Sequence, residues 1–197
     1  MSLQSLFAAF NKYLPLTDEE KDALSACTTE RRLRRRQLIL QEGEICKHYT
    51  FVVDGCFKKY HVDTKGVEHN LQFIAENDWI TEVDSIHNVK PSRMFIEAIE
   101  PATVLQIAQG DLYNLLSRYQ KMERIFRVII EDRYVALENR LLQTISETAE
   151  ERYLSFMEQY SNLSSRLPNT QIASYLGITP EFLSKIRGNL SKKTEKS

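Results

Sequence analysis

Cysteine and long apolar runs are both scarce in this chain. Its 197 residues include three cysteines, an odd number at no metal-ligand spacing: Cys27, Cys46 and Cys56. They predict free thiols in a reducing compartment, not a disulfide framework. The first ten residues lack a basic region followed by an apolar run, and no apolar stretch approaches bilayer-spanning length. We therefore expect a protein of the cytoplasm with no membrane partner.

An excess of charge is also missing. The net charge is -1, which excludes a globally basic nucleic-acid binder. Basic residues nevertheless collect near the end of the chain, against Glu181 and Glu195: Arg166, Lys185, Arg187, Lys192, Lys193 and Lys196. We expect Ser191–Ser197 to be a frayed, solvated terminus. The basic residues before it would then supply the positive charge for a DNA contact.

What is present is a helix-turn-helix pattern at residues 170–187. Ile172, Ala173 and Leu176 share one face of a short helix, and Gly177 can end that helix in the left-handed conformation. Thr179 can then cap a second helix that begins with Pro180. In the second helix Phe182, Leu183 and Ile186 are expected to face inward. The alternative is an ordinary helical hairpin; the spacing together with the caps favours DNA binding.

The middle of the chain has the pattern of a β jelly roll. Short β-type runs alternate with turn signals such as Asp54-Gly55 and Asp63–Gly66. The runs are Leu38–Leu40, Tyr49–Val53, Cys56–Val62, Asn70–Ile74, Met94–Ile99 and Val104–Ile107. Many short strands at regular spacing predict a sandwich or barrel.

Helical patterns flank this region. An apolar stripe over residues 3–10 and a capping box at Thr17–Glu20 predict two N-terminal helices. The arginine-rich segment Arg31–Arg36 is interpreted as a solvated or salt-bridged face.

A short helix follows residue 110, and a long helix begins near Lys121. Its apolar stripe, at near-heptad spacing, predicts a seam for a partner helix, with packing on the chain's own jelly roll as the alternative. The stripe comprises Ile125, Phe126, Ile129, Ile130, Ala136, Leu137, Leu141 and Ile145.

In this order, jelly roll, long helix and helix-turn-helix, the chain resembles the Crp/Fnr superfamily of bacterial transcription regulators, in a short form of Bacteroidetes type. The most specific motif runs from Glu42-Gly43-Glu44 through Tyr49, Phe51 and Val53 to Gly55. The resemblance implies an α+β fold with three parts. They are a cyclic-nucleotide-binding-like jelly roll with N-terminal helices (1–110), a dimerisation helix (111–147) and a helix-turn-helix domain (148–197).

The resemblance also implies a ligand segment at residues 81–83 and 92–93. Glu82 stands at the position of the carboxylate that accepts from a ribose hydroxyl, and Thr81 replaces a glycine before Val83. Ser92 takes the place of the arginine that neutralises the cyclic phosphate, and Arg93 falls on the other face of the strand unless a bulge corrects the register. The effector is therefore a cyclic nucleotide, another small molecule or none.

In the helix-turn-helix, the resemblance implies base contacts from Thr179, Glu181, Ser184 and Lys185, and Pro180 replaces a base-reading donor. Thr170 and Gln171 are placed for phosphates, and Arg187 lies on the outer face. A wing after the second helix has no room in this sequence. The implied partners are a pseudo-palindromic duplex, a second copy of the chain and RNA polymerase.

Other function classes fit less well. Cys27 alone near the start cannot hold an iron–sulfur cluster, and the four histidines show no haem-ligand pairing. A cupin-like metal enzyme would need ligands from His61, Glu68, His69 and Glu82, which do not have the spacing of that site. We therefore predict a regulator and not an enzyme, with an effector-independent regulator as the main alternative.

Overall fold

The structure, a computed structural model, describes residues 2–194 of the chain. These residues fall into two compact units. The first comprises the chain up to His61 together with Gln72–Arg133, and the second comprises Val62–Leu71 together with the chain from Tyr134 onward. The long helix α5 (Gln120–Ser146) contributes residues to both.

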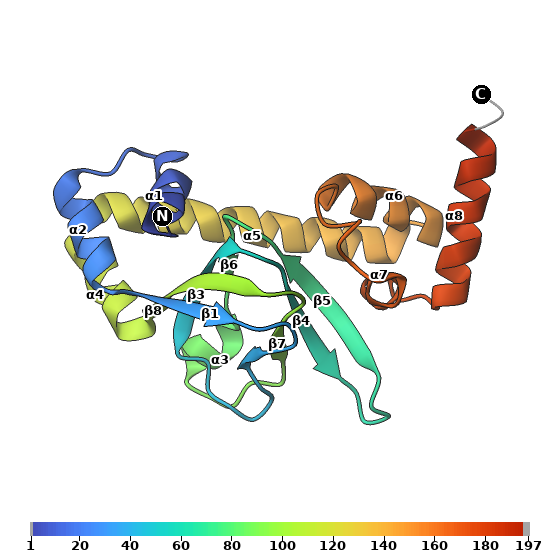
Figure 1. Cartoon of the computed structure of the whole chain (residues 1–197), viewed down its shortest axis with the longest axis horizontal. Coiled ribbons are helices and arrows are strands. Elements are labelled where there is room, and N and C mark those ends of the chain that lie inside the picture. Colours follow the sequence, from blue (N-terminus) through green and yellow to red (C-terminus); the bar gives the residue numbers. More distant parts are fainter. Residues whose placement is uncertain (1, 195–197) are drawn as a thin grey trace. The chain divides into compact units, whose positions relative to one another are not determined.

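The predicted jelly roll is two four-stranded sheets with antiparallel pairing (Figure 1). The first sheet has the order β1 (Thr28–Leu33), β8 (Ala102–Ala108), β3 (His48–Asp54), β6 (Trp79–Ile80). The second has the order β2 (Leu38–Leu40), β7 (Phe95–Ala98), β4 (Phe57–Val62), β5 (Glu68–Ile74). The expected α+β fold class is therefore confirmed.

The first sheet contributes to two cores, because successive side chains of β3 and β8 point to opposite faces. Val52 and Val104 point between the sheets, into a core that also contains Leu33 and Ile96. Phe51 and Leu105 point the other way, into a second core covered by helices. These helices are α1 (Ser2–Asn11), α2 (Asp18–Ala26), α4 (Gln109–Arg118) and the first turns of α5.

Aromatic side chains join the helices to the sheet. The Trp79 ring lies 6.2 Å from the ring of Phe10 and 5.1 Å from that of Phe126, measured between centroids. Met122 and Ile125 of α5 are fully buried beside them. Each such side chain stabilises the fold by about 1.5–3 kcal/mol relative to an exposed one, so the start of α5 belongs to the first unit's core.

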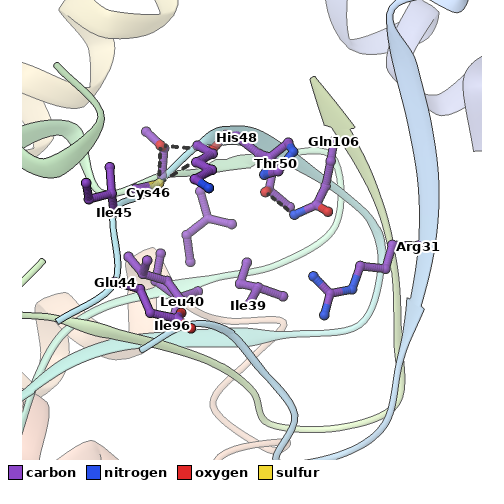
Figure 2. A pocket seen from close by; sticks show the side chains of 13 residues that line it. Arg31, Ile39, Leu40, Glu44, Ile45, Cys46, His48, Thr50, Ile96 and Gln106 are labelled. Atoms are coloured by element: carbon purple, nitrogen blue, oxygen red, sulfur yellow. Dashed lines mark hydrogen bonds between the residues drawn. The ribbon is translucent and has the colours of Figure 1, made fainter. Parts of the chain in front are cut away.

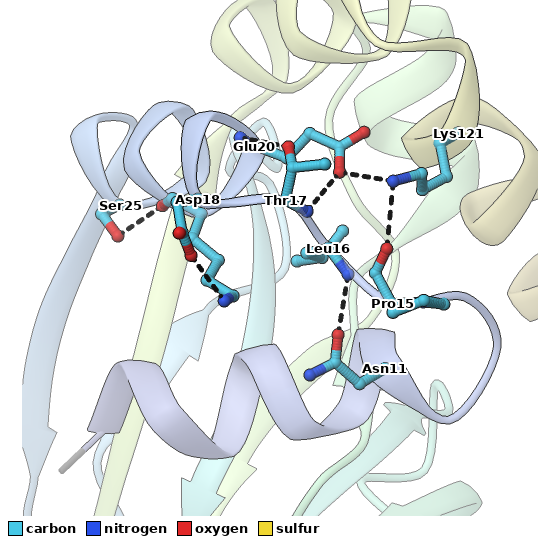
Figure 3. Close-up of polar contacts among 9 residues, drawn as sticks. Asn11, Pro15, Leu16, Thr17, Asp18, Glu20, Ser25 and Lys121 are labelled. Atoms are coloured by element: carbon cyan, nitrogen blue, oxygen red, sulfur yellow. Dashed lines mark hydrogen bonds and ion pairs between the residues drawn. The ribbon is translucent and has the colours of Figure 1, made fainter.

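The predicted capping box at the start of α2 is present (Figure 3). The Thr17 hydroxyl accepts from the Glu20 amide, and the Glu20 carboxylate accepts from the Thr17 amide at 2.7 Å. The same carboxylate oxygen lies 2.8 Å from Lys121 Nζ on α5. The cap of α2 is thereby tied to the long helix.

One turn between strands requires glycine. Gly55 has φ +97°, and a Cβ there would lie 2.6 Å from the Cβ of Ala102. The Asp54-Gly55 turn predicted from sequence thus has both a conformational and a steric reason.

Three elements were not predicted. Strand β1 overlaps the arginine-rich segment, β6 has two residues, and α3 (Val83–Asn88) interrupts the segment assigned to ligand binding. Their sequences lack the apolar alternation that marks a strand and the apolar stripe that marks an amphipathic helix. Their formation depends instead on contacts made in the tertiary fold.

The second unit contains three helices after α5: α6 (Ala149–Gln159), α7 (Asn169–Leu176) and α8 (Pro180–Thr194). Two expectations for α8 were wrong. Phe182 is 47% exposed, because it lies to one side of the buried stripe formed by Leu183 and Ile186. The helix also continues through Ser191 to Thr194, where a frayed terminus was expected; residues 195–197 lie outside the described part.

Among the described helices, none combines the length and the apolar character needed to cross a bilayer.

Candidate functional sites

The helix-turn-helix has the turn and caps that its sequence predicts. Gly177 adopts the left-handed conformation at φ 68°, ψ 33°, and its N–H bonds back to the last turn of α7. Thr179 then caps α8, its hydroxyl accepting from the Phe182 amide at 3.2 Å. The inner faces of the two helices are buried, through Ile172, Ala173, Leu176, Leu183 and Ile186. This packing fixes the angle at which α8 leaves the turn.

The outer face of α8 is polar and exposed. Thr179, Glu181, Ser184 and Lys185 are exposed, and Pro180 is partly exposed. Hydrogen bonds from its own backbone amide and from Thr179 lower the pKa of Glu181, so its carboxylate is an acceptor at neutral pH. The face therefore presents an acceptor and a donor within its first two turns.

Three other predicted DNA contacts lie on or near α7. Thr170 is exposed, and Arg187 bonds to the Asn169 side chain at 2.5 Å. Gln171 is partly buried, and its side-chain oxygen accepts from Asn70 Nδ2 at 2.9 Å. In this structure the Gln171 side chain therefore has a partner within its own unit.

The second half of α5 exposes a continuous apolar face. Its first turns are buried, but beyond them large side chains are 52–75% exposed. They are Ile130, Tyr134, Val135, Leu137, Leu141, Leu142 and Ile145. Steps of three, four and seven residues relate them, which is the spacing of a coiled-coil seam. A face of this size is unusual for a helix that has no partner.

The predicted ligand carboxylate has a structural task. Glu82 is buried and is the N-cap of α3, accepting from Ser85 N at 2.9 Å and from Asp84 N at 3.2 Å. Thr81 donates its hydroxyl to the His48 carbonyl, and the Val83 side chain is 62% exposed. The three residues are adjacent in sequence but do not converge on one cavity.

Ser92 and Arg93 precede β7 (Phe95–Ala98) and differ in exposure. Ser92 is buried, and its hydroxyl accepts from the Met94 amide at 2.9 Å. Arg93 is exposed, and its carbonyl accepts from His61 Nδ1.

A cation that sequence reasoning missed lies inside the sandwich. Lys59 of β4 shares a face with the core residue Phe57, and its Nζ donates to the Thr81 carbonyl at 3.2 Å. Burial lowers the pKa of Lys59, while the nearby Glu82 carboxylate acts in the opposite direction. This lysine thus places its ammonium at Thr81, within the segment predicted from sequence to bind a ligand.

A separate pocket of about 440 Å³ lies within the first unit (Figure 2). Of the predicted ligand residues it includes Thr81 but not Glu82, Val83, Ser92 or Arg93. Its walls come from both sheets: Arg31, Ile39, Leu40, Glu44, Ile45, Cys46, Lys47, His48, Thr50, Ile80, Thr81, Ile96 and Gln106. A volume of this size suits a small organic ligand.

Known proteins resemble this chain in both sequence and fold. The profile of the cyclic nucleotide-binding domain family matches residues 30–119. The probable transcriptional regulator flp of Lacticaseibacillus casei is 24% identical over 90% of this chain and 83% of its own length. Among solved structures, FixK2 of Bradyrhizobium japonicum superposes with a TM-score of 0.71 at 21% identity, covering 85% of this chain and 86% of that one. A Crp/Fnr-family regulator of Eubacterium rectale gives 0.69 at 15% identity, covering 90% and 85%.

The chain therefore contains a match to the cyclic nucleotide-binding domain family and is similar, over most of its length, to regulators of the Crp/Fnr family. Its relatives in the comparison are transcription regulators and not enzymes. Among the described residues, no three His, Cys, Asp or Glu side chains form a group that could hold a metal ion.

Two candidate functional residues that were not predicted from the sequence, Arg31 and Lys59, lie in β1 and β4. Arg31 was assigned to a solvated or salt-bridged face, and it is exposed, but it also lines the pocket; Lys59 was not singled out from its strand. Alternation from the apolar Phe57 could have identified Lys59 as inward-facing. The direction of Arg31 depends on the pairing of β1 with β8, which the sequence does not display.

Proposed function

We propose that this protein is a homodimeric, DNA-binding transcription regulator of Crp/Fnr type that acts in the cytoplasm. The observation that carries the proposal is the capped helix-turn-helix with an exposed polar face, in a chain that also contains a cyclic nucleotide-binding domain. The proposed functional division is a sensor over 1–110, a dimerisation helix over 111–147 and a DNA-binding domain over 148–197.

The recognition element in this proposal is α8. Its first turns would enter the major groove, where Glu181 can accept from a cytosine amino group and Lys185 can donate to guanine O6 and N7. Thr179 and Ser184 supply hydroxyls on the same face, while Pro180 supplies no donor. Arg187, Thr170 and Gln171 would contact phosphates, and Gln171 would first have to leave Asn70.

The apolar face of α5 is the proposed dimer contact. Two copies of this seam, paired around a two-fold axis, would bury the exposed leucines and isoleucines against each other. The same axis would relate the two α8 helices, about 34 Å apart on a pseudo-palindromic operator. RNA polymerase is the further partner expected of an activator.

The effector of the proposed regulator is a small molecule other than a cyclic nucleotide. Support comes from Glu82, whose carboxylate caps α3, and from the outward Arg93. An effector would act by shifting the population of two arrangements, with the hinge near Gln143–Thr148. The second candidate is an effector-independent regulator, which Lys59 favours by bonding to Thr81 in the ligand's place.

Lys185 gives the test of DNA recognition. Fluorescence anisotropy would measure the affinity of the wild type, Lys185→Ala and Lys12→Ala for duplexes enriched from a random pool. Loss of a base contact should cost about 1–3 kcal/mol and relax specificity at one position per half-site. Lys12→Ala removes an exposed lysine of the other unit and should bind as the wild type does. Equal affinities for all three proteins would refute the assignment.

A further inference from the structure

The 440 Å³ pocket has polar and aliphatic lining residues (Figure 2). Thr50 and Gln106 lie in one row across β3 and β8, and Gln106 Nε2 donates to the Thr50 hydroxyl at 3.1 Å. Ile80 of β6 continues this row beside Thr50, and the other aliphatic lining residues are Ile39, Leu40, Ile45 and Ile96. The lining residues include no Phe, Tyr or Trp, so the pocket offers no platform on which a purine or another aromatic ring could stack.

Arg31 supplies a cation at the mouth. It shares a face of β1 with the core residue Leu33, and it pairs with Val104 of the same core. Its guanidinium points into the pocket (Figure 2). Within the part of the chain that the structure describes, this side chain has no hydrogen bond or ion pair, whereas its neighbour Arg32 pairs with Glu30 at 3.5 Å.

The potential at the mouth is positive. Lys47 and His48 lie beside Arg31 in the lining, and Glu44 is the acid among the described lining residues. The Glu44 carboxylate is engaged by the Gln41 amide at 3.0 Å. Partial burial lowers the pKa of His48, and the charges of Arg31 and Lys47 lower it further. When His48 is neutral, the positive charges of Arg31 and Lys47 and the negative charge of Glu44 give the mouth a net charge of about +1. This charge is complementary to a ligand with one negative charge.

We propose that this pocket binds an aliphatic carboxylate, with Arg31 as its anchor. The planar guanidinium would hold the carboxylate through two parallel hydrogen bonds. The Gln106 amide would add a neutral donor, and the hydrocarbon body would lie against Ile39 and Ile96. The inference deepens the proposed function by naming an effector class, and it rests on that function only for what binding does to DNA affinity.

Calorimetric titration of the full chain tests the proposal. The probes are straight-chain carboxylates from hexanoate to dodecanoate, with octanol as the uncharged match of octanoate. We expect octanoate to bind more tightly than octanol, and affinity to rise with chain length. Arg31→Gln should weaken carboxylate binding about tenfold or more, the value of a charge-assisted bidentate pair. Arg32→Gln, which removes the adjacent outward arginine, should leave binding unchanged.

Several outcomes would overturn the inference. They are no binding at millimolar carboxylate, equal binding of octanol and octanoate, equal loss in Arg31→Gln and Arg32→Gln, or tighter binding of cyclic AMP than of any carboxylate. DNA binding is measured on the same preparations. A protein that binds DNA but no carboxylate loses only this inference, whereas a protein that binds carboxylate but no DNA loses the proposed function.

Discussion

Glu82 shows how one side chain can satisfy a family pattern and serve another purpose. Its carboxylate accepts from two backbone amides at the start of α3 and is buried. A carboxylate in this position satisfies donors that α3 would otherwise leave unpaired. The residue is therefore explained by local structure before any ligand is considered.

Replacing this cap should cost stability and not ligand affinity. Glu82→Ala is expected to lower the free energy of unfolding by about 1–2 kcal/mol, as loss of a helix cap does. Urea denaturation measures the change, and Glu42→Ala, an exposed turn glutamate, should stay within about 0.5 kcal/mol of the wild type. An unchanged Glu82→Ala protein would contradict the structural role.

The carboxyl group of Glu20 should make the stability of the fold depend on pH. Burial acts to raise its pKa, but hydrogen bonds from Lys121 and Thr17 outweigh burial and hold the pKa below the ordinary 4.5. Because the folded pKa is depressed, the stabilisation is complete above pH 4.5 and is lost as pH falls through the folded pKa.

Lys121→Met should raise the pKa of Glu20 and move acid unfolding to higher pH. An unfolding titration followed by circular dichroism would show the shift. Lys21→Met is the matched control, because it breaks a pair with Asp18, whose side chain is 95% exposed. A curve for Lys121→Met that coincides with the control would rule out the coupling.

At the scale of elements, Asn70 joins β5 to α7 within the second unit. Asn70 is 3% exposed, and its Nδ2 donates to both the carbonyl and the side-chain oxygen of Gln171. The Ser174 hydroxyl accepts from the Asn70 amide and donates to the Glu68 carbonyl. These bonds hold residues 68–70 on the first helix of the helix-turn-helix.

Asn70→Asp should loosen this contact, because it places a carboxylate oxygen against two acceptors of Gln171. We expect faster amide exchange in α7 and a lower melting temperature. Asn162→Asp makes the same change at an exposed turn residue and should exchange as the wild type does. Unaltered protection of α7 in Asn70→Asp would show that the contact does not contribute in solution.

The exposed face of α5 gives the second prediction at this scale. Leu137→Glu puts a charge into the proposed seam and should convert the dimer to a monomer, as sedimentation velocity would reveal. Asn162→Glu adds the same charge at an exposed turn residue outside α5 and should leave the dimer intact. A wild-type chain that sediments as a monomer would contradict the seam itself.

For the whole molecule, sequence patterns predicted the parts that local rules determine. Gly177, Thr179 and the capping box at Thr17 set helix ends through nearest neighbours, and those ends are found as predicted. Strand β1 was missed because its six residues, apart from Leu33, are polar or charged and show no apolar alternation. The pocket was missed because its walls meet only after β1 pairs with β8, a contact across more than 70 residues.

The measurement that tests the central claim most directly is selection of duplexes from a random pool by the full-length protein. We predict enrichment of an inverted repeat with half-site centres about 34 Å apart, one turn of B-DNA, bound by two chains per duplex. Enrichment of a single half-site bound by one chain would contradict the dimer, and no enrichment at all would contradict a DNA-binding regulator.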